Sequence, residues 1–227
     1  MPPADQRNRI LGAMSQADTD SFFSDLHPVS WSLRQIVYEV GAPLEHVYFV
    51  ERGIVSILTK LSTGEGIEAG MIGFEGVVGL AALFGDEMSG QQMIVQAPVI
   101  ALRMDASKCI AAFDQSADVR TVILRYTGKL LRIAAQTTAC NRVHSLKQRS
   151  ARWLLMMYDR LQSDDMPLTH DFLSSMLGVR RTRVTEVAGE LQRSGLIRYA
   201  RGMVTILDHP GLSAAACECY RTHDRLT

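Results

Sequence analysis

The spacing of hydrophobic and polar residues changes along the chain, and the first distinct pattern lies between Trp31 and Arg103. Short runs rich in Val, Ile, Tyr and Phe alternate there with turns that contain glycine. The expected strands comprise residues 36–40, 46–50, 54–59, 67–72, 92–96 and 99–103. Because these runs recur at roughly 10-residue spacing, they predict a small antiparallel barrel or roll.

Residues 107–144 have a helical pattern instead. The positions of one stripe recur at alternating steps of four and three residues, as in a heptad repeat. This stripe consists of Val119, Ile123, Tyr126, Leu130, Ile133, Thr137, Cys140 and His144. Such a stripe fits two structures: a seam that pairs with a second copy of the helix, or the apolar face of an amphipathic helix that lies on its own domain.

A second domain is expected to begin after this helix. Ser145 is followed three residues later by Gln148, which is a capping box and predicts a new helix that runs through Leu161. A chain of 227 residues can hold two small domains. We therefore expect a β-roll domain over residues 1–111, a long helix over residues 112–144 and a second domain over residues 145–227.

Residues 168–195 have the pattern of two short amphipathic helices joined by a tight turn. Thr169 is a suitable N-cap for the first helix, and Gly178 suits the turn. A hairpin with a turn at residues 200–202 is expected next, which completes a winged helix. The buried face of the second helix comprises Val184, Val187, Ala188 and Leu191. Without a ligand, the same pattern would be two core helices and a hairpin.

The distribution of charge favours DNA as the ligand of this winged helix. The chain as a whole has a formal net charge of zero. Residues 141–207, however, hold eleven Lys and Arg against six Asp and Glu, a net charge of +5. Arg180 and Arg181 lie in the first turn of the second helix, where the helix dipole disfavours cations unless a polyanion is present. A recognition helix enters the major groove of DNA with that end.

The segments LTHDFLSSMLGVRRTRVTE and GLIRYARGMVTIL resemble the Crp/Fnr family of bacterial transcription regulators. The resemblance extends over most of the chain and implies an α+β fold. Its parts are an N-terminal antiparallel β-roll of the cyclic-nucleotide-binding type, similar to a cupin jelly roll, a long dimerisation helix and a C-terminal winged helix–turn–helix. It also implies a homodimer that binds a palindromic operator under control of a small signal sensed by the roll, with RNA polymerase as a further partner. A regulator of the same fold that needs no effector is the alternative.

The resemblance also indicates which residues contact DNA and which pair the two copies. Base reading falls on Arg181, Thr182 and Glu186, of which only Arg181 matches the common pattern of the family. Thr182 or Thr185 is expected to touch a thymine methyl group. The other candidates for DNA contact, mainly with phosphates, are Thr169, His170, Arg180, Arg183 and Arg201. The heptad stripe of residues 119–137 is expected to form the dimer interface.

Residues 73–80 resemble the phosphate-binding segment of the family's roll, where a helix after glycines points N–H groups at an anion. The candidates for an effector pocket are Glu75, Gly76, Gly79, Leu80, Gln91 and Gln92. The family's cyclic-nucleotide binders use an arginine for the phosphate, but residues 88–92 contain neither Arg nor Lys. Glu75 precedes Gly76 rather than following it, which is a second departure from the pattern of the family's cyclic-nucleotide binders. We therefore do not expect cyclic AMP as the effector; the glycines form tight turns or hold another small molecule.

Other chemistries find little support in the sequence. The four cysteines, Cys109, Cys140, Cys217 and Cys219, have no spacing typical of a zinc site, so no metal is expected and the thiols are interpreted as reduced. A cupin-like metalloenzyme fused to a DNA-binding domain would need clustered histidines, but residues 31–103 contain only His46. No GxSxG or P-loop motif occurs, and no apolar run is long enough to cross a membrane. We expect a cytoplasmic regulator that is not an enzyme, has no assigned cofactor and has no membrane partner.

Overall fold

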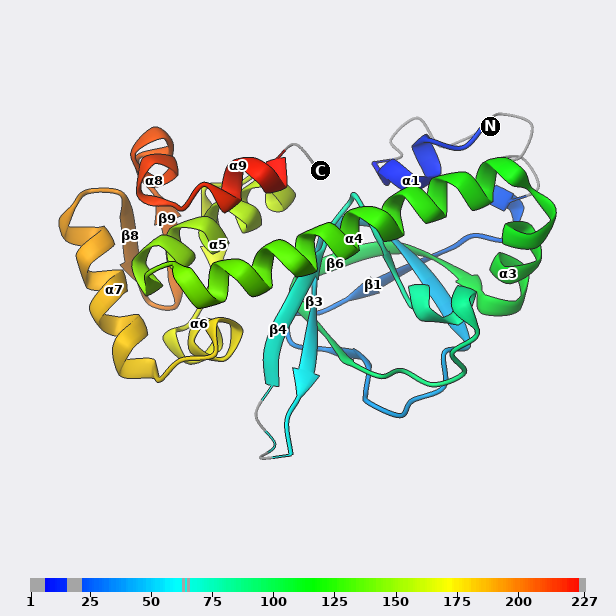
Figure 1. Ribbon diagram of the computed structural model, residues 1–227, viewed down its shortest axis with the longest axis horizontal. Helices are drawn as coiled ribbons and strands as arrows, with labels where there is room; N and C mark the ends of the chain where they lie inside the picture. Colours follow the sequence, from blue (N-terminus) through cyan, green and yellow to red (C-terminus); the bar gives the residue numbers. More distant parts are fainter. Residues whose placement is uncertain (1–6, 16–21, 63, 65, 225–227) are drawn as a thin grey trace. The chain divides into compact units, whose positions relative to one another are not determined.

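Helix α4, Ala117–Val143, belongs to both of the two compact units into which the chain divides (Figure 1). The computed structural model describes residues 7–15, 22–62, 64 and 66–224. The first unit comprises Met1–Leu58 and Gly70–Leu131, and the second comprises Thr59–Ala69 and Arg132–Thr227. The division thus falls inside the helix, whereas the limits expected from the sequence lie near its two ends.

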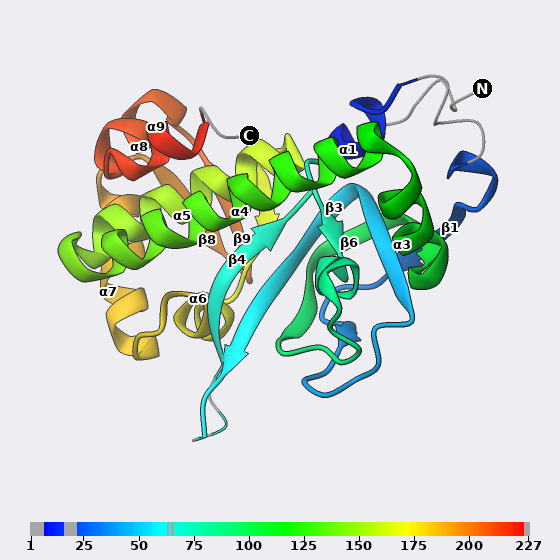
Figure 2. The ribbon, with the colours of Figure 1, turned by 45° about the vertical axis from the view of Figure 1, so that its right-hand side comes forward.

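An antiparallel sheet forms the greater part of the first unit (Figure 2). In the described residues its strands are β1 (His27–Trp31), β2 (Ile36–Tyr38), β3 (His46–Lys60), β4 (Gly66–Ile72), β5 (Val77–Val78) and β6 (Gln92–Asp105). The order along the sheet is β1-β6-β3-β4, with β2 paired to β6 and β5 paired to β3. This confirms the antiparallel architecture expected from the alternation of apolar runs and glycine turns.

Two of the expected turns are absent in the described sheet, because β3 and β6 each continue through them. The pairing register between these strands shifts three times around Gly53, as at a β-bulge. Gly53 has φ +87°, and a Cβ atom on it would lie 2.1 Å from the carbonyl oxygen of Pro98. Glycine therefore bends a long strand here instead of ending it.

The core of the first unit lies between this sheet and several helices. Helix α1 comprises Arg9–Gly12, the 3₁₀ helix η1 comprises Leu80–Phe84, and α3 comprises Ala106–Gln115. Phe49 and Met104, on β3 and β6, are buried at the centre of the core. The first half of α4 supplies further core side chains.

The face of α4 that carries the heptad stripe packs on its own chain. Val119 and Ile123 are each 1% exposed, Tyr126 is 6% exposed, and all three belong to the core of the first unit. Leu130 packs against the same core, Ile133 is half-buried, and Thr137 accepts a hydrogen bond from Arg152 at 3.1 Å. A single chain therefore already buries Val119, Ile123 and Tyr126, which leaves these three side chains little surface for a partner. The stripe is the apolar face of an amphipathic helix.

A different face of α4 is open to solvent. Leu124 is 49% exposed and Leu131 is 68% exposed, and these residues lie seven positions apart. Ala134, Ala135 and Thr138 extend the exposed surface along the helix. The helix therefore has a second stripe of apolar and small residues that its own chain does not cover.

The second unit contains helices and a small sheet. The capping box of Ser145 and Gln148 is present and begins α5, Leu146–Leu161. The other helices are α6 (His170–Leu177), α7 (Arg181–Arg193), α8 (His209–Ala215) and α9 (Cys219–Asp224). The wing strands β8 (Ile197–Ala200) and β9 (Met203–Ile206) are joined by β7 (Asp165–Pro167), a strand that the sequence did not reveal.

The second unit also contains buried apolar side chains. Buried side chains of α5, including Leu154, Leu155 and Met157, lie in the second unit with Leu168 and Leu191. None of the helices in the described part of the chain is long and apolar enough to cross a membrane.

Candidate DNA-binding interface

The turn between α6 and α7 places the candidate DNA-contact residues. The hydroxyl of Thr169 accepts a hydrogen bond from the backbone N–H of Phe172 at 3.2 Å and caps α6. Gly178 ends α6 in the left-handed conformation with φ +63°. Helix α7 then begins at Arg181, and no side chain caps its first turn. The N-terminus of α7 therefore has backbone N–H groups and arginines together.

The two faces of α7 differ as the sequence predicted. The buried residues of this helix are Val184, Val187, Ala188 and Leu191. The exposed residues at its N-terminal end are Arg180, Arg181, Thr182, Arg183, Thr185 and Glu186. A polar, solvent-exposed N-terminal half on an anchored helix is the arrangement that major-groove recognition requires.

Two ion pairs between exposed side chains lie on this face. Arg181 Nε lies 3.3 Å from an oxygen of Asp171, and Arg183 Nη1 lies 2.6 Å from an oxygen of Glu186. More than half of each of these four side chains is exposed. Because exposed pairs contribute about 0–1 kcal/mol to stability, DNA can replace them at low cost.

His170 has a structural position that the sequence did not show. Its ring stacks on Tyr199 of β8, with centroids 4.3 Å apart and planes 13° from parallel. Its Nδ1 lies 3.0 Å from Oγ1 of Thr185 on α7, and its Nε2 is buried without a hydrogen-bond partner among the described residues. Burial, and secondarily the charge of Arg181, lower the pKa of His170. His170 therefore connects α6, α7 and the wing in its neutral form rather than offering a charge to phosphates.

The wing ends in a two-residue turn. Ala200 pairs with Met203, and the two residues between them, Arg201 and Gly202, have φ +52° and +75°. Positive φ at both central positions is typical of the type I′ hairpin turn. The carbonyl of Gly202 accepts a hydrogen bond from the N–H of Leu168 at 2.8 Å, which ties the wing to the start of α6. Arg201 is thus exposed at a fixed point of the wing.

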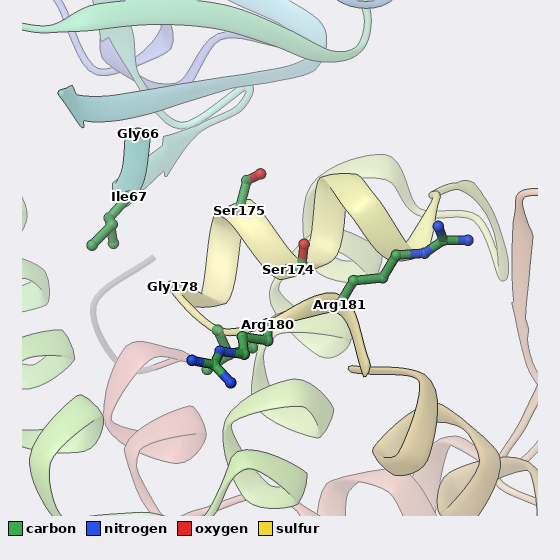
Figure 3. Close-up of a pocket in the computed structure, with 8 residues that line it drawn as sticks. Gly66, Ile67, Ser174, Ser175, Gly178, Arg180 and Arg181 are labelled. Carbon is green, nitrogen blue, oxygen red and sulfur yellow. The ribbon is translucent and has the colours of Figure 1, made fainter. Parts of the chain in front are cut away.

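A cavity of about 450 Å³ lies beside the α6–α7 turn (Figure 3). Arg180 and Arg181 line it, and their side chains extend in different directions from the turn. The other lining residues are Gly66, Ile67, Ser174, Ser175, Gly178 and Val179. Because two guanidinium-bearing residues line this open cavity, it is part of the same electropositive face.

The two glycines among the candidate effector residues are closely surrounded by other atoms of the first unit. A Cβ atom on Gly76 would lie 2.2 Å from the hydroxyl of Tyr126, and one on Gly79 would lie 2.6 Å from the carbonyl oxygen of His46. Gly79 also has φ +85°, and Leu80 begins only the five-residue helix η1. Close packing and a tight turn account for both glycines, while Glu75 is half-buried beside them.

The glutamine pair of the expected pocket faces other parts of the roll. The side-chain amide of Gln92 donates a hydrogen bond to Glu39 at 2.8 Å, and Ser89 donates to the carbonyl of Gln91 at 2.6 Å. Ser89 and Gln92 therefore supply uncharged groups that already have partners. Sequence reasoning missed a buried polar pair, Ser56 and Gln96, whose side chains lie 2.5 Å apart inside the sheet.

Comparison with known protein families agrees with this architecture. A family described as the Crp-like helix-turn-helix domain matches residues 148–215, and one described as the cyclic nucleotide-binding domain matches residues 28–116. The chain belongs to the Crp/Fnr family of transcription regulators. As a Crp/Fnr regulator, it has a DNA-binding helix-turn-helix domain, and α6, α7 and the wing lie within it.

Solved structures share the fold of this Crp/Fnr regulator. FixK2 from Bradyrhizobium japonicum is 19% identical with a TM-score of 0.73, covering 85% of this chain and 98% of FixK2. The c-di-GMP responsive regulator CLP of Xanthomonas campestris is 17% identical with a TM-score of 0.71, covering 86% and 100%. A CRP-family regulator of Thermus thermophilus is 20% identical with a TM-score of 0.72, covering 83% and 96%. No curated protein sequence matches the chain significantly.

The structure also brings together three of the four cysteines. Cys140, Cys217 and Cys219 are buried next to one another and next to His144, whereas Cys109 lies in the core of the first unit. The spacing of the cysteines did not indicate this cluster, because 77 residues separate Cys140 from Cys217. Only the fold of the second unit brings these side chains to one place.

Proposed function

We propose that this Crp/Fnr regulator binds a palindromic operator as a two-fold dimer and reads it with the N-terminal half of α7. The observation that carries the proposal is the exposed, uncapped start of this helix, where Arg181, Thr182 and Glu186 lie on one open face. Two such helices on a two-fold dimer meet half-sites about one helical turn, roughly 34 Å, apart.

The chemistry of the side chains suggests how bases are read. The guanidinium of Arg181 can donate two hydrogen bonds to guanine O6 and N7, and the carboxylate of Glu186 can accept one from cytosine N4. Glu186 must first leave Arg183, its present partner at 2.6 Å. Because Thr185 is engaged with His170 and with the carbonyl of Arg181, Thr182 is the better candidate for a thymine methyl group.

Phosphate contacts are assigned to groups at the edge of this face. Arg180 and Arg183 flank the reading positions, Thr169 begins α6, and Arg201 lies at the wing turn. Such contacts orient a protein on the duplex without specifying its sequence. The operator is therefore expected to have one specified base pair per half-site that depends on Arg181.

The dimer is assigned to the exposed stripe of α4 that contains Leu124 and Leu131. Continuation of the stripe by Ala134, Ala135 and Thr138 allows two helices to approach closely. Leu131→Glu should yield monomers in sedimentation experiments, because an unpaired charge buried in an interface is strongly disfavoured. The matched control is Leu130→Glu, which replaces a side chain packed on its own core and should lower stability instead. A Leu131→Glu dimer would contradict the assignment.

The signal sensed by the roll is proposed to be a molecule other than cyclic AMP. Residues 88–92 have no cation for a cyclic phosphate, and an unpaired buried phosphate would be costly. The alternative is a regulator that needs no effector. We also propose RNA polymerase as a further partner. In the described β-roll, no group of three potential metal ligands supports a cupin-like enzyme.

Selection of operators from random DNA with the full-length protein tests this function. The expected result is a palindrome with half-sites centred about one helical turn apart. The same selection with the Arg181→Ala protein should give a palindrome that has lost its preference at one base pair of each half-site. A selected pool without two-fold symmetry would contradict the dimer, and a pool without any preferred sequence would contradict base reading by α7.

A further inference from the structure

A cluster of four potential metal ligands lies in the second unit. Cys140 is in the last turn of α4 and His144 follows that helix, while Cys217 precedes α9 and Cys219 is its first residue. Each offers one ligand atom, and the four atoms all lie within 4.8 Å of one another. The two segments thus bring three sulfur atoms and one ring nitrogen to a single point.

Two distances within the cluster are close to those of tetrahedral coordination. Sγ of Cys140 lies 3.5 Å from Sγ of Cys217, and Sγ of Cys219 lies 3.6 Å from Nδ1 of His144. Around a tetrahedral zinc ion with Zn–S bonds of about 2.3 Å and Zn–N bonds of about 2.0 Å, two sulfurs lie about 3.8 Å apart and a sulfur and a nitrogen about 3.5 Å apart. A disulfide sulfur pair is much closer, at about 2.0 Å.

Neighbouring groups hold the ligands in the orientation that a metal requires. The carboxylate of Glu218 lies 3.1 Å from Nε2 of His144, so Nε2 carries the proton and Nδ1 presents its lone pair to the sulfurs. A carboxylate on the far nitrogen of a histidine is the usual support of a metal ligand. The side-chain amide of Gln136 donates a hydrogen bond to Sγ of Cys219 at 2.9 Å.

The three cysteines of the cluster are buried, and the charge of Arg152 acts on Cys140. Cys140, Cys217 and Cys219 are 0%, 3% and 1% exposed, and they form a buried cluster of their own, apart from the apolar core of the first unit. Burial raises the pKa of Cys140 and raises that of Cys217 to about 12, so these two thiols are protonated without a metal. The buried Arg152 favours a negative charge on Cys140.

We propose that Cys140, His144, Cys217 and Cys219 bind one Zn²⁺ ion as a closed tetrahedral site. Three sulfur ligands and one imidazole are a ligand set of structural zinc sites, and zinc needs no change of oxidation state on binding. The three thiols release their protons to solvent, and the neutral imidazole coordinates through Nδ1. The resulting charge of the site is −1, which the guanidinium of Arg152 offsets.

The consequence is a tie between two distant parts of the second unit. The metal joins the end of α4 to the segment between α8 and α9, closing a loop that runs through α5, the helix-turn-helix and the wing. Because metal binding to such a site contributes directly to folding free energy, the winged helix would be stabilised by zinc. The site has no open position for a substrate, since the protein fills all four.

Metal analysis of the untagged full-length protein tests the proposal. Protein purified without chelators should contain about one zinc per chain, and Cys217→Ser should lose most of it. Cys109→Ala is the matched control: it also removes a buried cysteine, but one in the first unit, and should retain the metal. Glu218→Gln leaves all four ligands in place and should lower zinc affinity about tenfold in a chelator competition.

Cobalt substitution of the wild-type protein gives a measurement that does not depend on the folding of a variant. Co²⁺ added to metal-free protein should produce the intense visible bands of tetrahedral cobalt with thiolate charge transfer. Their absence, or zinc content equal in the wild-type and Cys217→Ser proteins, would overturn the proposal. So would iron with inorganic sulfide in the purified protein, or a chain mass that shows a disulfide between Cys140 and Cys217. None of these measurements involves DNA, so they are independent of the operator proposal.

Discussion

The exposed N-terminal face of α7 and the roll both contain candidate binding residues. Their polar groups differ in solvent exposure and in the partners that they already have. On α7, Arg181 and Arg183 are exposed and held by weak ion pairs that a ligand can replace. In the roll, Gln92 is buried and paired to Glu39, while Gly76 and Gly79 are in close contact with neighbouring atoms. The charged side chains of α7 are thus exposed to a polyanionic ligand. The named groups of the roll are instead hydrogen-bonded or closely packed within the protein.

The largest effect is expected from filling the space at Gly79. Gly79→Ala should lower the free energy of unfolding by about 3 kcal/mol, because it combines a positive φ with a methyl group too close to a carbonyl oxygen. Gly85→Ala at the other end of η1 is the control, since it has φ +95° with no atom within 4 Å of the added Cβ. Urea denaturation of both variants measures the difference. An equal loss of unfolding free energy in the two variants would mean that the backbone around Gly79 can shift to accept a methyl group.

The second largest effect is expected from removing the guanidinium of Arg181, which tests whether this exposed group contacts a base. Arg181→Ala should weaken binding to the cognate operator by about 1–3 kcal/mol and relax preference at one base pair per half-site. Arg193→Ala removes the same charge from the C-terminal end of the helix and should change affinity far less. Titration of the selected operator and its single-base variants provides the measurement. If Arg181→Ala weakens every variant equally, the residue contacts phosphate and does not read a base.

A smaller and non-specific effect is expected at the wing. Arg201→Ala should weaken binding to all sequences alike and reduce the slope of log affinity against log salt by about one. The control is Arg198→Ala, an exposed arginine within β8 rather than at the turn. Binding isotherms at several salt concentrations measure the slope. An unchanged slope would remove Arg201 from the phosphate contacts.

No effect at all is expected from cyclic AMP or cyclic GMP on the roll. Calorimetry at micromolar protein should give no binding heat with either nucleotide, because residues 88–92 offer no cation to the phosphate. Operator affinity measured with and without each nucleotide should be equal. Tight binding of either one would show that the packed roll segment opens to accept a charged ligand.

Local signals in the sequence were sufficient for the winged helix. Thr169 caps α6, Gly178 takes the left-handed conformation, and Ser145 forms its capping box, each through atoms a few residues away. The two short wing strands were also predictable from their apolar runs and glycine turn. The antiparallel roll followed from the spacing of similar runs.

Features that depend on distant parts of the chain were not predictable. The periodicity of α4 shows that Val119 and Ile123 share a face, but only the structure shows that this face packs on its own core. The sequence around Gly53 is typical of a turn, and only its contact with Pro98 shows a bulge. The cysteine cluster depends on the break between α8 and α9, which turns Cys217 and Cys219 toward the end of α4.

The contacts of His170 have a mechanical consequence for regulation. Its stacking on Tyr199 and its hydrogen bond to Thr185 connect the wing, α6 and α7. Because these contacts oppose movement of α7 relative to the wing, we expect a signal in the proposed dimer to act on the separation and angle of the two α7 helices. In the proposed dimer, the separation of the two recognition helices that fits the operator is roughly 34 Å.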